Sequence, residues 1–227
     1  MSLQKSLTIF IEEIPQQHLA EAIAEAADIT PQQGLQMLYT YINETRVALR
    51  LTESVLKKNK QMLEVGAGLC LFSLFLKQEG YEITALEPGA GGFDAFTIAK
   101  QVILDYYQSI PLPVINHTAQ ELNPDIDGRF DLIFSNNVVE HIPNFKQALS
   151  ALNHCLSEGG AMIHGCPNYF IPYEPHLQLP VLKIWPGLSE RLFRRQIEKR
   201  RAVWESLNFI SYFDVKSFAD ENGLEVH

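Results

Sequence analysis

Apolar residues recur at roughly helical spacing over the first sixty residues of the chain. Thr30 precedes Pro31, an order typical of a helix N-cap followed by proline at the first helical position. The apolar residues that continue this pattern are Leu35, Leu38, Ile42, Val47 and Leu51. We therefore expect residues 1–60 to form an N-terminal helical extension, in which the pattern shows no obvious chemistry.

From residue 61 the pattern changes to short apolar runs that alternate with helical segments. The expected strands are 61–65, 82–87, 114–118, 130–135 and 161–165. The expected helices are 69–79, 93–106, 144–156 and 215–222. This alternation predicts an α/β fold, with a mostly parallel central sheet and helices on both faces. Ligands bind such sheets in the crevice beyond the carboxyl ends of the strands.

A different texture follows the fifth expected strand. Five prolines between Pro167 and Pro186 interrupt a stretch rich in Tyr, His, Leu and Trp. This composition predicts a packed lid insertion at about 167–205 rather than a hydrophilic linker. The last residues, 223–227, read as the beginning of a sixth strand, so we expect the C-terminal strands to be incomplete.

Composition narrows the class of protein. With 227 residues, 46% of them hydrophobic and 20% charged, the chain is typical of one soluble globular domain. It has no apolar run long enough for a membrane span, and its first residues lack the features of a signal peptide. Its three cysteines are widely spaced, which predicts neither a disulfide framework nor a metal site. We expect a cytoplasmic protein.

Charge bears on the partners of the protein. The chain has 18 basic and 27 acidic residues, a net charge of −9, which disfavours binding to nucleic acid. One basic run lies at 191–201. It is interpreted first as the solvated face of a helix, and alternatively as a patch for an anionic acceptor or a membrane surface.

The strongest chemical signal is a glycine-rich turn after the first expected strand. Gly66 and Gly68 would let the backbone approach a ligand closely, at the point where a strand turns into a helix. Glu87 ends the next strand, 21 residues beyond Gly66. That spacing is expected for an acid that binds the two hydroxyls of a ribose.

Two neighbouring residues separate the possible nucleotide ligands. A nicotinamide fingerprint needs a third glycine at position 71, where this chain has Leu71. Glu64, just before the first glycine, would repel phosphates and suits a ligand that carries an ammonium and a sulfonium. The residues therefore favour S-adenosylmethionine, and an NAD-dependent oxidoreductase is the less favoured alternative.

Four segments in order resemble those of the class I S-adenosylmethionine-dependent methyltransferases, in the ubiquinone-biosynthesis-like branch with the type 11 and type 23 methyltransferase domains. These segments are 63–68, 86–88, 130–143 and 156–160, and the resemblance covers about 61–168. Glu158 stands where the family has proline. The resemblance implies a Rossmann-like methyltransferase domain over 61–227, with S-adenosylmethionine as cofactor and S-adenosylhomocysteine as product.

The resemblance also implies the residues that bind the cofactor. They are Glu64, Gly66, Ala67, Gly68, Glu87, Pro88, Ala119, Gln120, Ser135 and Asn136. Gly66 and Gly68 would pass beneath the methionine part, with Glu64 near its ammonium group. Glu87 would bind the ribose, the 118–121 segment would flank the adenine, and the end of the fourth strand would lie near the sulfonium. Cys70, in the same loop, is expected to be a buried and inert thiol.

The acceptor is less clearly indicated. Asn136-Asn137 differs from the Asn-Pro-Pro-Tyr motif used on nucleobases and glutamine, so a small-molecule acceptor is expected. Methyl transfer would be an in-line displacement, with oxygen as the expected acceptor atom, although nitrogen and carbon acceptors stay open. His141 is the candidate base, and Tyr173 and His176 in the lid are candidate acceptor contacts. A non-catalytic module that binds S-adenosylmethionine is the alternative function.

Overall fold

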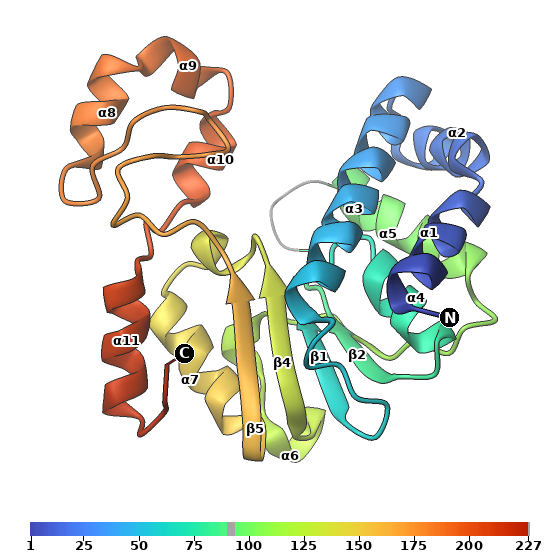
Figure 1. The fold of residues 1–227 in the computed structure, drawn as a ribbon. Helices are drawn as coiled ribbons and strands as arrows, with labels where there is room; N and C mark the ends of the chain where they lie inside the picture. Colours follow the sequence, from blue (N-terminus) through green and yellow to red (C-terminus); the bar gives the residue numbers. More distant parts are fainter. Residues whose placement is uncertain (90–93, 227) are drawn as a thin grey trace. The chain divides into compact units, whose positions relative to one another are not determined.

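The computed structural model describes residues 1–89 and 94–226. Its centre is a sheet of five strands in the order β3-β2-β1-β4-β5 (Figure 1). The strands are β1 (Gln61–Val65), β2 (Glu82–Leu86), β3 (Val114–Ile115), β4 (Phe130–Asn136) and β5 (Leu156–Gly165). β1 pairs in parallel with β2 and β4, and β2 pairs in parallel with β3. The expected α/β class, a parallel sheet flanked by helices, is confirmed.

β2 and β4 differ from the expected strands by one residue at their ends, and two other strands, β3 and β5, differ by more. β3 is shorter than predicted, because Thr118 already caps the short 3-10 helix η1 (Ala119–Glu121). β5 begins at Leu156, five residues before the expected start, and includes Gly159-Gly160, a pair that is locally typical of a turn. The backbone N–H of Phe130, the first residue of β4, donates to the carbonyl of Cys155 at 2.8 Å. The two segments are therefore already paired at Cys155, before the chain reaches the glycines. Long-range pairing thus overrides the local turn signal.

The chain forms two compact units. The first comprises Met1–Asn136 and Ala151–Ile163, and the second comprises Asn137–Ser150 and His164–His227. Phe93, the predicted start of the helix that begins at Asp94 in the structure, lies outside the described residues, as does His227.

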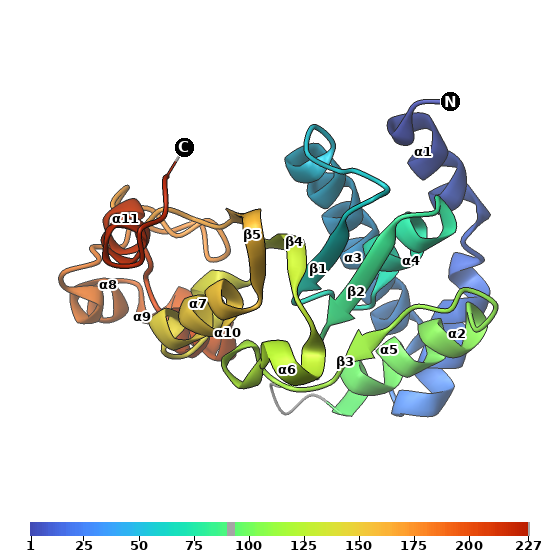
Figure 2. The same ribbon diagram turned by 90° about the horizontal axis from the view of Figure 1, so that it is seen from below.

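Helices of the first unit surround its part of the sheet. They are α1 (Leu3–Glu13), α2 (Gln16–Ala27), α3 (Pro31–Thr52), α4 (Leu71–Gln78), α5 (Asp94–Tyr106) and α6 (Pro124–Asp127). α2 contacts both α3 and α5, and α3 also contacts α4 and β4 (Figures 1 and 2). As predicted, Thr30 caps α3: its side chain accepts from the N–H of Gln33, and the Gln33 side chain bonds back to Thr30. One apolar core joins helices α1 to α5 to β1, β2 and β4.

The second unit has its own, smaller core. Its elements are the 3-10 helix η2 (Val139–His141), α8 (Pro186–Leu192), α9 (Arg194–Glu198), α10 (Arg201–Ser206), α11 (Tyr212–Glu221) and the first part of α7 (Phe145–His154). The buried apolar residues that form this core are Tyr169, Leu179, Val181, Ile197, Trp204 and Leu207. Tyr169, Leu179 and Val181 anchor the proline-rich segment in this core, whereas other large apolar side chains of the segment, such as Ile184 and Trp185, are exposed.

Residues 222–226, which follow α11, form no strand in the structure. Gly223 has φ +67°, and the N–H of Leu224 donates to the carbonyl of Ala219 at 2.9 Å. This arrangement is typical of a glycine C-cap that ends a helix. Among the described residues, no helix is both long and apolar enough to cross a lipid bilayer.

Candidate functional site

The glycine loop lies at the carboxyl end of β1 and is bonded to the end of β2. Gly66 and Gly68 have φ of +68° and +60°, conformations that favour glycine. The N–H groups of Gly66 and Ala67 both donate to the carbonyl of Leu86, at 2.8 and 3.2 Å. This loop lies beside the point where the strand order reverses between β1 and β4, where parallel sheets bind ligands.

Glu87 is held at this point by two backbone groups. Its Oε2 accepts from the N–H of Gly68 at 2.9 Å, and its Oε1 accepts from the N–H of Gly89 at 3.0 Å. The pKa of Glu87 lies above its ordinary value, because burial disfavours the charged carboxylate. The two backbone bonds and the Lys100 ammonium oppose this shift without cancelling it. Each carboxylate oxygen has a second lone pair. The side chain is thus fixed and can still accept from two hydroxyl groups of a ligand.

Lys100 stabilises the same region, and the sequence patterns did not identify it. Its buried ammonium donates to the carbonyl of Glu87 at 2.8 Å and to Oδ1 of Asn116 at 3.0 Å. Buried charges need such partners. The signal that could have revealed it is a lysine on the apolar face of a helix, next to Ala99 and near Ile103. Lys100 joins the end of β2 to the residue that follows β3.

Glu64 is a second buried carboxyl group in the first unit. It accepts a hydrogen bond from the hydroxyl of Ser73 in α4. Burial raises the pKa of Glu64 to about 7, the charge of Glu87 also raises it, and the Ser73 bonds oppose the shift. A group with this pKa gains charge when a cation binds beside it. Two buried carboxyl groups at one edge of the sheet favour a cationic ligand over a phosphate.

Helix α3 contributes Tyr41 to the glycine loop. A Cβ atom at Gly68 would lie 2.2 Å from Cε1 of Tyr41 and 2.6 Å from its Cδ1, so only glycine fits. The Tyr41 ring also contacts Phe96, with ring centroids 5.6 Å apart. Burial and the charges of Glu87 and Glu44 raise the pKa of the Tyr41 phenol. Sequence reasoning missed Tyr41, since its helix appeared to carry no chemistry.

The end of β4 is bonded to the same helix. Nδ2 of Asn136 donates to the carboxylate of Glu44, one turn of α3 beyond Tyr41. Ser135 is fully buried and stands opposite Val65 in the parallel pairing of β1 with β4. The ends of β1 and β4, where the sequence placed the sulfonium, are therefore adjacent and braced by α3.

The proposed adenine segment is rigidly capped. Ala119 and Gln120 lie in η1, and the N–H and hydroxyl of Thr118 donate to Oε2 of Glu121 at 2.8 and 2.7 Å. These bonds lower the pKa of Glu121. Ala119 is buried, so the backbone and side chain of Gln120 are the groups of this segment that could meet a ring.

Pro88 and Cys70 lie in the loops that follow β2 and β1. Pro88 lies between Glu87 and Gly89, whose N–H binds the Glu87 carboxylate. Cys70 is fully buried at the start of α4, where burial raises the pKa of its thiol. A protonated, buried thiol is chemically inert.

In the second unit, His141 has a defined tautomer. Its Nδ1 lies 2.8 Å from Oγ of Ser206, and that hydroxyl donates to the carbonyl of Val203 at 2.7 Å. Because the hydroxyl proton is already used, Nδ1 of His141 is the donor and Nε2 carries the lone pair. Burial and the neighbouring His176 lower the pKa of His141.

The imidazole of His176 is bonded to a buried carboxylate. Its Nδ1 lies 2.8 Å from Oε1 of Glu174, which is fully buried and also accepts from the hydroxyl of Tyr169. The rings of His141 and His176 are edge to face, with centroids 5.3 Å apart. The structure thus brings together two histidines that the sequence had selected separately. Tyr173, by contrast, is 48% exposed.

Glu140 and His164 are two other titratable groups of this unit. Glu140 is fully buried, and ligand atoms of Glu140, His141 and His176 all lie within 4.8 Å of one another. His164 is half-buried, and desolvation of its ring lowers its pKa to about 4, so it is a neutral histidine.

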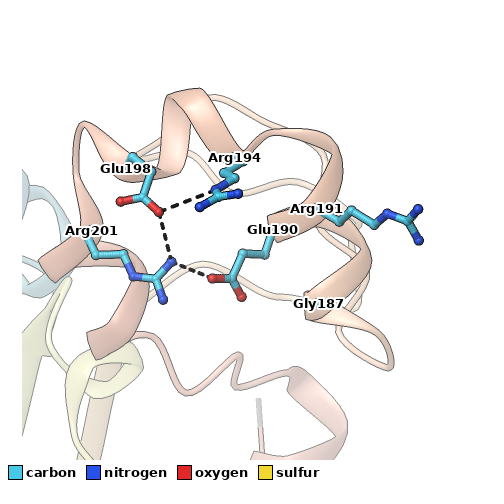
Figure 3. A pocket seen from close by; sticks show the side chains of 6 residues that line it. All are labelled: Gly187, Glu190, Arg191, Arg194, Glu198 and Arg201. Atoms are coloured by element: carbon cyan, nitrogen blue, oxygen red, sulfur yellow. Dashed lines mark hydrogen bonds and ion pairs between the residues drawn. The ribbon is translucent and has the colours of Figure 1, made fainter.

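The basic run forms a pocket in which two of the three lining arginines, Arg194 and Arg201, pair with glutamates. Its lining residues are Gly187, Glu190, Arg191, Arg194, Glu198 and Arg201 (Figure 3). Arg201 pairs with Glu190, Glu198 and Glu205, at 2.5, 3.7 and 2.7 Å. In Figure 3 the Arg191 side chain points away from the others. Exposed pairs of this kind are typical of a solvated helix face, which was the first interpretation of this run.

Comparison with known proteins identifies relatives of the chain. The profile of a family described as a methyltransferase domain matches residues 16–227. An uncharacterised protein of Mycobacterium tuberculosis is 36% identical over 164 residues, which are 70% of this chain and 55% of that protein. A ribosomal protein L11 methyltransferase of Helicobacter pylori is 28% identical over 167 residues, 73% of this chain and 45% of that protein. The chain spans about half the length of these relatives.

Solved structures share the fold. The YcgJ protein of Bacillus subtilis has a TM-score of 0.56 at 14% identity, with 79% of this chain and 68% of that chain covered. Phosphoethanolamine N-methyltransferase 2 of Haemonchus contortus, in complex with phosphomonomethylethanolamine and S-adenosylhomocysteine, has a TM-score of 0.54 at 15% identity. There the match covers 80% of this chain and 36% of that chain.

Proposed function

Because the chain belongs to the methyltransferase-domain family, whose class I members use S-adenosylmethionine, we propose that it transfers a methyl group from this cofactor to a small molecule. S-adenosylhomocysteine is the second product. The observation that supports the proposal most is the bond from the Gly68 N–H to the Glu87 carboxylate, 2.9 Å long. It joins the glycine loop and the ribose-binding acid in one rigid arrangement at the carboxyl edge of the sheet.

The proposed donor site lies in the first unit. Glu87 binds the ribose hydroxyls with the two lone pairs that Gly68 and Gly89 leave available. Glu64 neutralises the ammonium of the methionine part, since a cation beside it favours its ionised form. Ala119 and Gln120 flank the adenine.

The remaining proposed contacts are at the strand ends. Gly66 and Ala67 pass beneath the methionine part, and Ser135 and Asn136 lie near the sulfonium. Leu71 argues against NAD, because the helix at this point begins with a buried leucine where a nicotinamide fingerprint has glycine.

Methyl transfer is proposed to proceed by in-line displacement. The bond from the methyl carbon to the acceptor oxygen forms as the carbon–sulfur bond breaks, and the sulfonium becomes a neutral thioether. Alignment of the two reactants supplies up to about 7–11 kcal/mol in favourable intramolecular cases. A hydroxyl acceptor must also lose its proton, and that loss needs a base or a cation that lowers the hydroxyl pKa.

The second unit holds the groups that we propose for the acceptor. His141 presents Nε2 with a free electron pair, and such a nitrogen can accept a proton or coordinate a metal ion. His176 lies beside it, and Tyr173 is exposed on the same proline-rich segment. A pair of proton-handling groups favours oxygen as the methylated atom.

The test is transfer of isotopically labelled methyl from S-adenosylmethionine to a panel of small hydroxyl and amine compounds. We expect labelled product from a hydroxyl compound with the wild-type chain and, at cofactor concentrations below saturation, less product with Glu87→Ala. Cofactor binding without transfer to any acceptor would instead indicate a non-catalytic binding module.

A further inference from the structure

Three side chains of the second unit converge in a way that the methyl-transfer proposal does not require. Glu140 and His141 are adjacent in η2, and His176 comes from the proline-rich segment. One ligand atom from each lies within 4.8 Å of the other two. Ligand atoms that lie about 2.0–2.2 Å from one ion are at most about 4.4 Å apart, so small side-chain shifts suffice to close this triangle around an ion.

The two imidazoles use the same ring nitrogen, Nδ1, for the hydrogen bonds that orient them. Nδ1 of His141 donates to Ser206, and Nδ1 of His176 donates to Glu174. Nε2 is therefore the unprotonated nitrogen in both rings. Metal-bound histidines usually donate their other N–H to a carboxylate, a carbonyl or a similar acceptor, which fixes the ring and its tautomer. Glu174 and Ser206 fill these roles.

The partners of the cluster are themselves held in place. Glu174 is fully buried and accepts from the hydroxyl of Tyr169, so its carboxylate cannot turn away from His176. Asn208 holds η2 through hydrogen bonds to its backbone carbonyls. Its Nδ2 donates to the carbonyls of Val139 and Ile142, at 2.6 and 3.0 Å, and its N–H donates to the carbonyl of Glu140 at 2.8 Å.

We propose that Glu140, His141 and His176 bind one divalent transition-metal ion. Two imidazoles and one carboxylate form the ligand set of many catalytic Zn²⁺ sites and of the facial triads of Fe²⁺. Mg²⁺ and Ca²⁺ prefer sites made of oxygen ligands alone. We therefore commit to a first-row transition metal and take Zn²⁺ as the probe.

Three protein ligands leave a coordination position open for an oxygen of another molecule. A hydroxyl bound there loses its proton more easily. In this assignment Nε2 of His141 is a ligand and not a base. The use of the ion in activating an acceptor rests on the proposed function, whereas the binding of the ion does not.

The test is titration of the chelator-treated full chain with Zn²⁺ by calorimetry, in parallel with His141→Gln, His176→Gln and the control His154→Gln. His154 is exposed and lies outside the cluster. We expect one site per wild-type chain, a loss of affinity of at least about 100-fold in the two cluster variants, and no change in the control. Loss of a ligand should weaken metal binding more than loss of a residue that only hydrogen-bonds to a ligand, which typically costs about 10–100-fold.

A spectroscopic measurement covers the case of a variant that does not fold. Co²⁺ added to the wild-type chain should give visible absorption bands that Zn²⁺ abolishes at one equivalent. Absence of such bands, or Zn²⁺ affinity unchanged in both cluster variants, would overturn the proposal. S-adenosylmethionine binding by the metal-free chain is measured alongside. If it persists without a metal site, only this inference fails; if it is lost while Zn²⁺ binds, only the proposed function does.

Discussion

The ring of Tyr41 occupies the space that a side chain at Gly68 would need, with Cε1 only 2.2 Å from the position of a Cβ atom there. Gly68 also has φ +60° and donates its N–H to Glu87. One residue therefore meets three demands: a left-handed backbone, contact with an aromatic ring and a bond to the proposed ribose-binding acid. Tyr41 and Glu44 make α3 part of the candidate cofactor site.

Gly68→Ala should destabilise the fold and abolish S-adenosylmethionine binding, because the new methyl group displaces either Tyr41 or the loop. Gly159→Ala is the matched control: Gly159 has φ +69°, but a Cβ there meets nothing within 4 Å. The control should cost only the ~1–2 kcal/mol of a left-handed non-glycine residue. Chemical denaturation and cofactor titration of both variants check this, and equal losses in the two would contradict the close contact with Tyr41.

Glu87→Ala should weaken S-adenosylmethionine binding by about 1–3 kcal/mol, the effect of lost hydrogen bonds to a charged group. Glu12→Ala, which removes an exposed carboxylate of α1, is the control and should bind normally. Calorimetry measures both affinities. If Glu87→Ala bound as tightly as the wild type, the ribose would have to lie elsewhere.

Cofactor affinity should rise with pH. Burial raises the pKa of Glu64 to about 7, so below that pH the group is neutral in the free protein and must lose a proton to pair with the ammonium. We expect weaker binding as pH falls below about 7, with proton release seen as a dependence of the binding heat on the buffer. Glu64→Gln should bind more weakly and lose this dependence. A flat pH profile in the wild type would place the ammonium away from Glu64.

The same pKa shift has the opposite effect on folding. The folded-state pKa of Glu64 lies above its ordinary value of 4.5, so the folded chain binds more protons than the unfolded chain between these pH values. The contribution of Glu64 to the free energy of unfolding should therefore fall as pH rises from about 4.5 to about 7. Denaturation of Glu64→Gln over this range should show a smaller decrease, and identical slopes would contradict the assignment.

Glu44 and Asn136 should be energetically coupled, because the Asn136 amide donates to the Glu44 carboxylate. A double-mutant cycle with Glu44→Ala and Asn136→Ala should give a coupling of about 0.5–3 kcal/mol in the free energy of unfolding. Gln36→Ala, on an exposed position of the same helix, serves as a control partner for Asn136→Ala. If the changes in the free energy of unfolding were additive for both pairs, the hydrogen bond from Asn136 to Glu44 would not link the end of β4 to α3.

Local sequence patterns predicted the parts of the site that depend on neighbouring residues. The glycine loop, Glu87 and the cap at Thr30 are read from residues a few positions apart, and the elements of the sheet follow from their apolar runs. Tyr41, Glu44 and Lys100 were missed because their contacts depend on the folded chain: Glu44 and Asn136 are 92 residues apart. Likewise, His141 and Ser206 are 65 residues apart, so the histidine tautomer is visible only in the structure. Gly159-Gly160 misled for the related reason that strand pairing decided their conformation.

Parallel calorimetric titrations with S-adenosylmethionine, S-adenosylhomocysteine and NAD test the central claim most directly. The account predicts that both adenosyl ligands bind at one site per chain, that NAD does not bind, and that Gly68→Ala abolishes both affinities. Binding of NAD in preference to the adenosyl ligands, or no binding of any of the three by the folded chain, would contradict it.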